Sequence, residues 1–266
     1  MKKIYKIIII YLGFTISTFG QTLLVKYCEN SIISEERLKE LPEEIRNERM
    51  KKKKYNLFVD VNKGLSYYVN DVYTKNSSYN TEYEKETQYD DHVEIITTKV
   101  IVDLKNTEKF YYKDFGKDEM LFEFFNGDQL FTGKDSLKNW NWQLTNETKI
   151  IYGYTCKKAT AVWGRGEYVA WFTEDIPVQA GPEKFDGLPG LILYVGTPYY
   201  EYSAVLVKEM KDKVNIEKPN FDKIKTYTLE EINDIIKQKI KGLQSSSITT
   251  QDGDKTITRE TIIYKN

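Results

Sequence analysis

Apolar and polar residues alternate along much of the chain between residues 93 and 209, in short runs separated by glycine, asparagine and aspartate. The run 202–209 is one example, with Tyr202, Ala204 and Leu206 at alternate positions. Short runs at this spacing predict antiparallel strands rather than βαβ units. We therefore expect a mostly β protein, built as a curved antiparallel sheet or half-barrel. An α+β fold is the alternative.

The N-terminal part predicts a different mixture of elements. Residues 22–27 read as a first strand, and residues 55–70 read as a hairpin with a turn at Asn62-Lys63-Gly64. Residues 34–54 are charged and favour helix, and Pro42 divides them, so we expect a helical insertion at the surface. Residues 71–91 are polar and rich in Tyr and Asn, and we expect them to form a mobile loop.

Near the C-terminus the pattern predicts one helix and a last hairpin. Thr228 and Glu231 form a capping box, which places the helix start. The apolar stripe that should pack on the sheet consists of Ile232, Ile235, Ile236, Ile240 and Leu243. Residues 246–264 predict a hairpin around Asp252-Gly253. No internal repeat or linker interrupts the chain, so residues 21–266 should form a single β-rich domain.

Residues 1–20 have the three parts of a secretory signal peptide: a basic start, an apolar run over 7–19, and small residues before Gln21. The alternative is a membrane anchor, but the run falls short of the about 20 residues that span a bilayer. We expect cleavage after Gly20 and export to the periplasm or the outer side of the envelope. No later segment is long and apolar enough to be a transmembrane helix.

Composition excludes several classes of function. The 266 residues carry 39 Lys+Arg and 40 Asp+Glu, and the basic cluster 51–54 stands alone, so we expect no nucleic-acid partner. The single histidine, His92, cannot build a zinc site of several imidazoles, and we expect neither a metal nor a cofactor. His92 lies at the end of a polar stretch, where a solvated side chain is the simplest reading. We predict no catalytic residues.

The two cysteines, Cys28 and Cys156, would both enter an oxidising compartment after export. A disulfide between them would close a long loop and stabilise the fold. Two buried thiols are the alternative, and the sequence does not decide between them.

The most unusual segment lies between Trp171 and Ile192. It combines three prolines and three glycines with large apolar side chains, which predicts a fixed and packed loop. We expect Leu188 and Ile192 to be buried and Gly190 to have a positive φ. If the loop instead binds a partner, Leu188 and Phe185 should be exposed together as an apolar patch.

This segment resembles the GLPGLI family, which is named for the string at Gly187–Ile192. The resemblance covers residues 151–194, and it departs from the usual pattern at Phe172, where the family shows Tyr. The positions that carry it, which we expect to be structural, are Trp171, Pro177, Gly181, Pro182, Phe185, Gly187, Leu188, Pro189, Gly190, Leu191 and Ile192. The resemblance implies an exported protein of Bacteroidota without an assigned catalytic role. The family's genes often lie near those of TonB-dependent outer-membrane receptors, which implies accessory work in transport or the envelope.

We therefore expect a monomeric, non-enzymatic envelope protein. Its partner would be an outer-membrane receptor, another envelope protein, a peptide or a lipid-like ligand. A periplasmic hydrolase that uses carboxylates is one alternative, and a structural envelope protein is another. A binding protein should show an apolar cleft, a hydrolase should show two carboxyls facing each other, and a structural protein should show neither.

Overall fold

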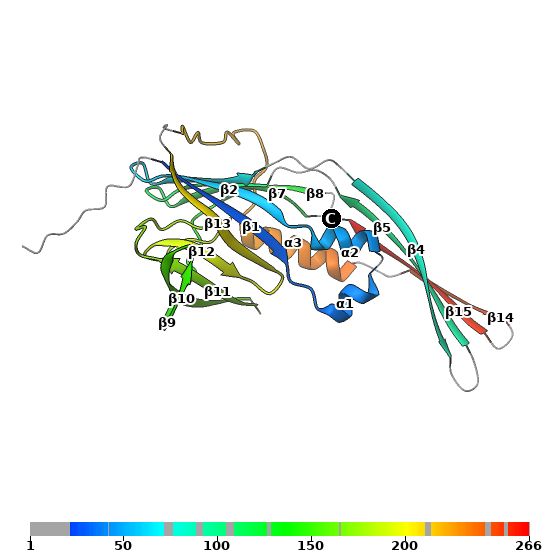
Figure 1. Ribbon diagram of the computed structural model, residues 1–266. Helices are drawn as coiled ribbons and strands as arrows, with labels where there is room; N and C mark the ends of the chain where they lie inside the picture. The colour runs from blue at the N-terminus through cyan, green and yellow to red at the C-terminus, as the bar shows by residue number, and fades with distance from the viewer. Residues whose placement is uncertain are drawn as a thin grey trace, which may run out of the picture.

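The computed structural model describes residues 22–41, 43–71, 77–88, 93–104, 109–126, 129–164, 166–210, 214–242, 246–252 and 255–265. Within these ranges β-strands dominate, and they form one sheet of eleven strands and one of four (Figure 1). The large sheet is antiparallel and does not close on itself. The prediction of a mostly β protein with a curved antiparallel sheet is confirmed.

The eleven-stranded sheet has the order β8-β7-β6-β3-β2-β1-β13-β12-β11-β10-β9, so the first strand of the chain lies at its centre. Its strands are β1 (Thr22–Ser31), β2 (Lys53–Asp60), β3 (Leu65–Asn70), β6 (Phe110–Asp114), β7 (Glu119–Asn126), β8 (Gln129–Asp135), β9 (Gln143–Ile151), β10 (Tyr154–Trp163), β11 (Gly166–Thr173), β12 (Leu191–Gly196) and β13 (Tyr200–Met210). The predicted hairpin over residues 55–70 corresponds to β2 and β3, which pair in antiparallel fashion.

Three helices accompany this sheet in the described part of the chain. The predicted N-terminal insertion forms α1 (Glu35–Glu40) and α2 (Glu43–Met50), and most of the side chains described there are exposed. The predicted C-terminal helix is α3 (Leu229–Gly242), where the Thr228 hydroxyl accepts a bond of 3.2 Å from the Glu231 backbone and Ile232 is buried. No helix in the described ranges is both long and apolar enough to cross a membrane.

The large sheet ends differently at its two edges. At β8, Tyr227 forms a bridge with Gly133, and its backbone exchanges hydrogen bonds of 3.1 Å with Thr132 and Lys134. At β9 the strand is irregular: Thr148 lies opposite Lys157 and Leu144 lies opposite Ala159, so three residues of β9 face one of β10. A described segment therefore covers the β8 edge, while β9 has β10 as its neighbour in the sheet.

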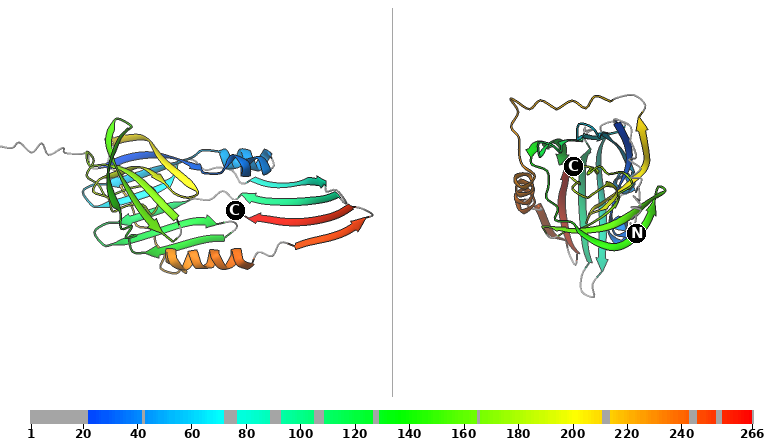
Figure 2. Two further views of the ribbon diagram at one scale, coloured as in Figure 1. Left: turned by 90° about the horizontal axis from the view of Figure 1, so that it is seen from below. Right: turned by 90° about the vertical axis from the view of Figure 1, so that its left-hand side faces the viewer.

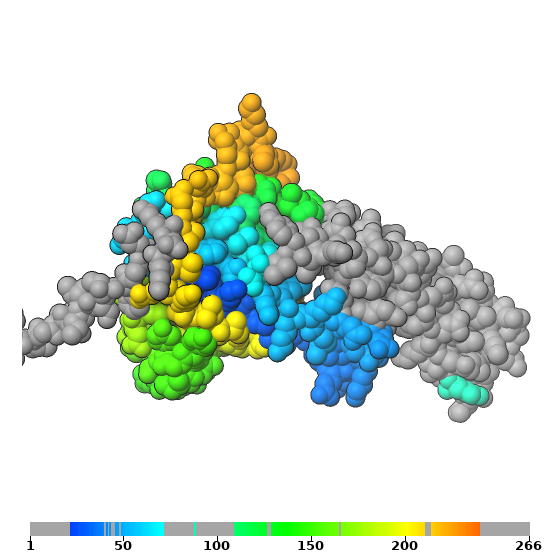
Figure 3. Space-filling view, turned by 45° about the horizontal axis from the view of Figure 1, so that its top comes forward, coloured from blue at the N-terminus to red at the C-terminus, as the bar shows by residue number. Residues whose placement is uncertain are grey.

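The segment that reaches β8 first crosses one face of the large sheet. Residues 214–228 form a ridge on the surface, seen in orange in Figure 3. Ile216 is buried there against Tyr112 and Leu121, and Lys218 lies 2.6 Å from Glu119 of β7. This segment buries apolar side chains on the sheet face away from the main core.

The second sheet forms an arm that projects from one end of the body (Figures 1 and 2). Its order is β14-β15-β5-β4, with the bounds β4 (Ser77–Gln88), β5 (Val93–Leu104), β14 (Ser246–Asp252) and β15 (Lys255–Lys265). The two central strands, β5 and β15, run parallel, while both outer pairs are antiparallel. The predicted C-terminal hairpin corresponds to β14 and β15.

The arm corrects two expectations. Much of the expected mobile loop over residues 71–91 is strand β4, because Tyr79, Thr81 and Tyr83 recur at every second position and pair with β5. Residues 93–104 form a strand as predicted, but they belong to the arm and not to the large sheet.

The two cysteines do not form the bridge that the sequence left open. Both are free thiols, Cys28 on β1 and Cys156 on β10. Strands β13, β12 and β11 lie between them, and at about 4.8 Å per strand the separation is roughly 19 Å. A disulfide needs Cα atoms within about 7 Å, so the sheet order itself keeps the two thiols apart.

Candidate functional site: the motif loop and the pocket beside it

Residues 174–190, which we call the motif loop, connect β11 to β12 and pack into the main core. The loop contributes five buried apolar side chains: Ile176, Val178, Ala180, Phe185 and Leu188. Ile192, at the start of β12, is also buried. The expected burial of Leu188 and Ile192 is confirmed, and Leu188 and Phe185 do not form an exposed patch. The loop is thus a part of the core rather than a flap on its surface.

Two glycines of the loop are required for different reasons. A Cβ at Gly190 would lie 2.0 Å from the Thr173 carbonyl oxygen, so the backbone there leaves no room for a side chain. Gly187 has a φ of 81° and open space around it. The expected positive φ at Gly190 is therefore wrong. Glycine is needed there because the backbone lies too close to Thr173 for any side chain, not because the residue adopts a left-handed conformation.

Three consecutive carbonyls of the loop each accept a hydrogen bond from a side chain outside it. The indole nitrogen of Trp140 donates to Lys184 at 3.0 Å, and that of Trp142 donates to Asp186 at 2.9 Å. Between them, the Lys113 ammonium donates to the Phe185 carbonyl at 2.9 Å. These bonds satisfy buried polar groups that no strand partner reaches, and they fix the position of the loop.

The two tryptophans also begin an aromatic cluster. Their ring centroids lie 5.4 Å apart in a stacked arrangement, and Trp140 stacks on Phe185 at 4.8 Å. Trp163 and Tyr168 surround Trp140 at 5.7 and 5.1 Å. Trp140 is buried by this cluster, while Trp142 remains partly exposed.

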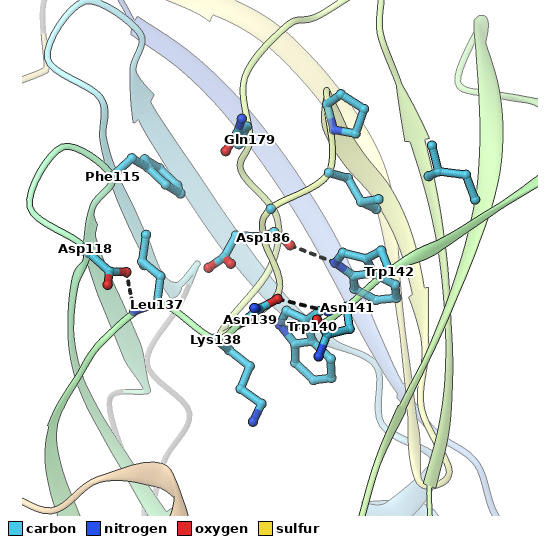
Figure 4. A pocket seen from close by; sticks show the side chains of 14 residues that line it. Phe115, Asp118, Leu137, Lys138, Asn139, Trp140, Asn141, Trp142, Gln179 and Asp186 are labelled. Atoms are coloured by element: carbon cyan, nitrogen blue, oxygen red, sulfur yellow. Dashed lines mark hydrogen bonds between the residues drawn. The ribbon is translucent and has the colours of Figure 1, made fainter.

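Trp142 forms part of the wall of a pocket of about 500 Å³ between three chain segments (Figure 4). Apolar side chains and backbone from the motif loop meet amide and carboxyl side chains there. The lining residues are Phe115, Asp118, Leu137, Lys138, Asn139, Trp140, Asn141, Trp142, Leu144, Gln179, Asp186, Gly187, Leu188 and Pro189. Its volume lies within the range of known small-molecule sites.

The carboxyl of Asp186 is the buried ionisable group of this pocket. It lies 2.9 Å from the Lys113 ammonium, and both side chains are almost completely buried. Burial raises the pKa of Asp186, and Lys113 only partly offsets this. Burial also lowers the pKa of Lys113. Burial therefore disfavours the charged form of both side chains in this ion pair.

A second ionic group lies deeper in the core. The Lys109 ammonium pairs with Glu29 at 2.5 Å and with Glu183, and Tyr202 donates to Glu183 at 2.8 Å. Burial alone would raise the pKa of Glu183, but Lys109 and Lys184 lower it to about 2. Because one ammonium joins these two buried carboxylates, they are not a pair that faces a substrate.

The structure divides the predicted motif residues into two groups. Gly187, Leu188 and Pro189 line the pocket. Trp171 lies on β11, with the Lys149 ammonium 4.2 Å from its ring centroid, and is not among the lining residues. The other motif positions serve the core or the backbone, except Pro177, which is exposed. His92 lies outside the described residues.

Sequence reasoning missed the residues that give the pocket its chemistry. Within the alternating stretch 93–209, residues 136–142 are irregular, and β9 begins only at Gln143. Two tryptophans spaced by two residues and flanked by Asn139 and Asn141 are the signal that marks this wall. Asp186 stood inside the motif but was not singled out.

The chain matches the model of a known protein family. The model described as "N-glycanase peptide, N-terminal domain", PNGase F-II, matches residues 70–233, which is more than half of the chain. The chain belongs to this family. The PNGase F-II N-terminal domain match includes the motif loop and all residues that line the pocket.

Two solved structures of PNGF-II, one in space group C2 and one in P21, are similar to the chain. Each is 15% identical to it and covers 88% of it, with TM-scores of 0.45 and 0.46 respectively. The chain spans only about a third of the length of these structures, 35% and 36%. Among curated proteins, no sequence matches.

Proposed function

We propose that this member of the PNGase F-II N-terminal domain family is an exported, non-enzymatic binding protein of the cell envelope. Its ligand is the saccharide part of a glycoconjugate, bound in the pocket beside the motif loop. The observation that carries the proposal is the partly exposed Trp142 ring, which stands among side-chain amides in a pocket of about 500 Å³.

The chemistry of a sugar ring explains this choice of ligand. A pyranose has a face of C–H groups, which packs on an aromatic ring, and hydroxyls around its edge, which need donors and acceptors. Trp142 offers the ring, and Asn139, Asn141 and Gln179 offer both donors and acceptors at an exposed rim. The family's description names an N-glycanase, which supports a saccharide over a peptide or lipid-like ligand.

Export and envelope work remain part of the proposal. The basic and apolar start of the chain supports a cleaved signal peptide over residues 1–20. The resemblance to the GLPGLI family supports accessory work beside a TonB-dependent receptor. Finding Met1 retained on a membrane-bound chain would contradict export, and N-terminal sequencing would reveal it.

Titration with disaccharides tests the binding proposal. We would follow intrinsic tryptophan fluorescence while adding N,N′-diacetylchitobiose or, for comparison, cellobiose. Saturable binding of either sugar is expected, and Trp142→Ala should weaken it by roughly tenfold or more. Trp171→Ala is the matched control, because Trp171 is a similar half-buried ring outside the pocket.

Trp142→Ala also removes the hydrogen bond from the Trp142 indole to the Asp186 carbonyl, which helps to hold the motif loop. Weaker binding in this variant therefore does not by itself identify a contact with the sugar, and a second variant is needed. Gln179→Ala changes an exposed rim amide and should weaken binding while leaving the unfolding midpoint unchanged. No fluorescence or calorimetric response to either sugar in a well-folded sample would refute the binding proposal.

A carboxylate hydrolase is the second candidate function. Asp118 and Asp186 both line the pocket, and burial raises the pKa of Asp186, as a general acid would require. Binding is favoured because the Asp186 carboxyl is buried and already paired with Lys113. Release of sugar from a labelled glycopeptide, lost in Asp186→Asn but kept in Trp171→Ala, would favour the hydrolase.

A further inference from the structure

The ion pair between Lys113 and Asp186 lies in the interior of the protein and is not used by the proposed sugar binding. The Lys113 Nζ and Asp186 Oδ2 atoms are 2.9 Å apart, and the two side chains are only 1% and 3% exposed. Even at this distance, Oδ2 has no well-directed hydrogen bond within the described part of the chain. The two groups are therefore in contact and shielded from solvent, without the alignment of a strong salt bridge.

The surroundings of Lys113 favour its neutral form. Its cross-strand neighbours are Ser66 on β3 and Met120 on β7, and both are buried. Beyond the ion pair, the ammonium donates a hydrogen bond to the Phe185 carbonyl at 2.9 Å. Burial lowers the pKa of Lys113 and raises the pKa of Asp186, and both shifts favour a neutral amine beside a neutral carboxylic acid.

We propose that Lys113 and Asp186 form an amide bond between their side chains, which links the motif loop covalently to strand β6. This modification is independent of the proposed saccharide and of any other ligand in the pocket. It gives the protein a cross-link that its two free thiols, Cys28 and Cys156, do not supply. Like a disulfide, it closes a long loop of the chain and restricts the unfolded state.

The reaction is a condensation of the two side chains and consumes no other reactant. One proton moves from the Lys113 ammonium to the Asp186 carboxylate, which leaves a neutral amine and a neutral acid. The amine nitrogen attacks the carboxyl carbon, and a C–N bond forms. The C–O bond to the hydroxyl then breaks, and the hydroxyl leaves with one amine proton as water. Because Asp186 lines the pocket, this water can leave through it.

The fold supplies the proximity that this reaction needs. The carboxyl carbon of Asp186 is one bond from the Oδ2 atom that Lys113 contacts, so attack requires little movement of either chain. Groups held in reacting geometry behave as if present at about 10⁵–10⁸ M, and desolvation activates a lysine as a nucleophile. The Asp186 carboxyl is turned away from the Trp142 ring (Figure 4), so the bond leaves that ring free for a sugar.

A second enclosed lysine, Lys109, lacks the condition that makes Lys113 reactive. Its ammonium pairs with two carboxylates, Glu29 and Glu183, and lies 4.4 Å from the centroid of the Tyr55 ring. Burial alone would lower the pKa of Lys109, but Glu183 and Glu29 raise it well above its ordinary value. An ammonium that keeps its proton has no lone pair for attack, so Lys109 should form no amide.

Trypsin digestion and mass spectrometry of the wild-type protein test the proposal. A branched peptide should join residues 110–117 to residues 185–208, because trypsin does not cut after an acylated lysine. Lys113→Arg keeps the positive charge but is not a nucleophile, so it should lose the branched peptide. After allowance for the substitution, the intact wild type should be lighter than this variant by one water molecule. A wild type with separate linear peptides and no loss of water would overturn the proposal.

A different reaction of Asp186 would also release water, and the peptide map separates the two. Asp186 precedes Gly187, and an Asp-Gly pair can form a cyclic imide with its own backbone, which leaves the peptide linear. A loss of water without the branched peptide would therefore also contradict the amide. Lys109→Arg is the matched control and should keep the branch at Lys113. The wild-type map decides the proposal without any altered protein, so a misfolded variant cannot imitate either result.

Discussion

The Lys113 ammonium lies 2.9 Å from the Asp186 carboxylate, and the same ammonium donates to the carbonyl of Phe185, the residue before it. One side chain from β6 therefore fixes both the backbone and the charge of the motif loop at the bottom of the pocket. Because both partners are buried, each depends on the other for its charge.

Removing one partner of the Lys113–Asp186 pair should destabilise the folded protein. Lys113→Met should lower the free energy of unfolding by about 3–5 kcal/mol, since it leaves the Asp186 charge buried without a partner. Lys117→Met is the control, because the Lys117 side chain is 71% exposed and Asp114 keeps its hydrogen bonds from the Gly116 and Lys117 backbone, so the loss should be only about 0–1 kcal/mol. Urea unfolding measures both. Equal losses in the two variants would mean that Asp186 gives up its charge at little cost.

The two glycines of the motif loop should respond to alanine differently. Gly190→Ala puts a Cβ 2.0 Å from the Thr173 carbonyl oxygen, and backbone must move, so the loss should be about 3 kcal/mol or more. Gly187→Ala meets no atom within 4 Å and should cost only about 1–2 kcal/mol for its positive φ. Thermal midpoints of the two variants should therefore rank Gly190→Ala below Gly187→Ala, and the reverse order would be inconsistent with this geometry.

Leu188→Ala should destabilise the protein by about 2–5 kcal/mol, because Leu188 is only 1% exposed within the core. Leu144→Ala is the matched control, since Leu144 also lines the pocket but is 58% exposed. It should change stability by less than about 0.5 kcal/mol. An unchanged midpoint in Leu188→Ala would mean that the loop does not support the core.

The charge of Glu183 should make stability depend on pH in the acid range. Its pKa is about 2 in the folded protein against an ordinary value of 4.5. A lowered pKa contributes stability that is complete above the unfolded pKa and is lost as the pH falls toward the folded one. The contribution should be about 3 kcal/mol.

The measurement compares wild type with Glu183→Gln in urea titrations from neutral pH to about pH 2. The difference between their free energies of unfolding should shrink across this window. Subtraction is necessary because other carboxyls, such as Asp71 and Glu119, also have lowered pKa values. A constant difference would show that Glu183 does not change its ionisation between the folded and unfolded states here.

The cysteines should behave as two unlike thiols. Cys28 is partly exposed, whereas Cys156 is fully buried and its pKa is raised by burial to about 11. A thiol reagent at neutral pH should modify one thiol in the native protein and two after denaturation, since the thiolate is the reacting form. Finding no thiol in the unreduced, denatured protein would restore the disulfide.

The sequence predicted the large sheet because apolar residues at every second position of a strand all face the core. Leu23, Val25 and Tyr27 alternate along β1, and all three are buried. The same rule failed for β4, whose alternating residues are tyrosine and threonine rather than aliphatic. The two-sheet arrangement could not be predicted either, because the partner of β5 across the parallel pairing is β15, more than 150 residues away.

The pocket was less predictable than the fold because it exists only where distant segments meet. Phe115, Trp142 and Gln179 come from three separate parts of the chain. The motif loop was recognised as packed from its prolines, glycines and leucines. The sequence did not predict that the Gly190 backbone lies directly against the Thr173 carbonyl. This contact depends on the path by which the loop returns to the sheet.

The irregular stretch of β9, where three residues face one of β10, has a consequence for how the protein behaves at high concentration. A growing fibril needs a straight row of unpaired donors and acceptors as its template. The irregularity breaks that row, and Glu147 and Lys149 set charges beside it. The irregular backbone therefore makes β9 a poor template for a further strand, along the same edge that carries the pocket residue Leu144.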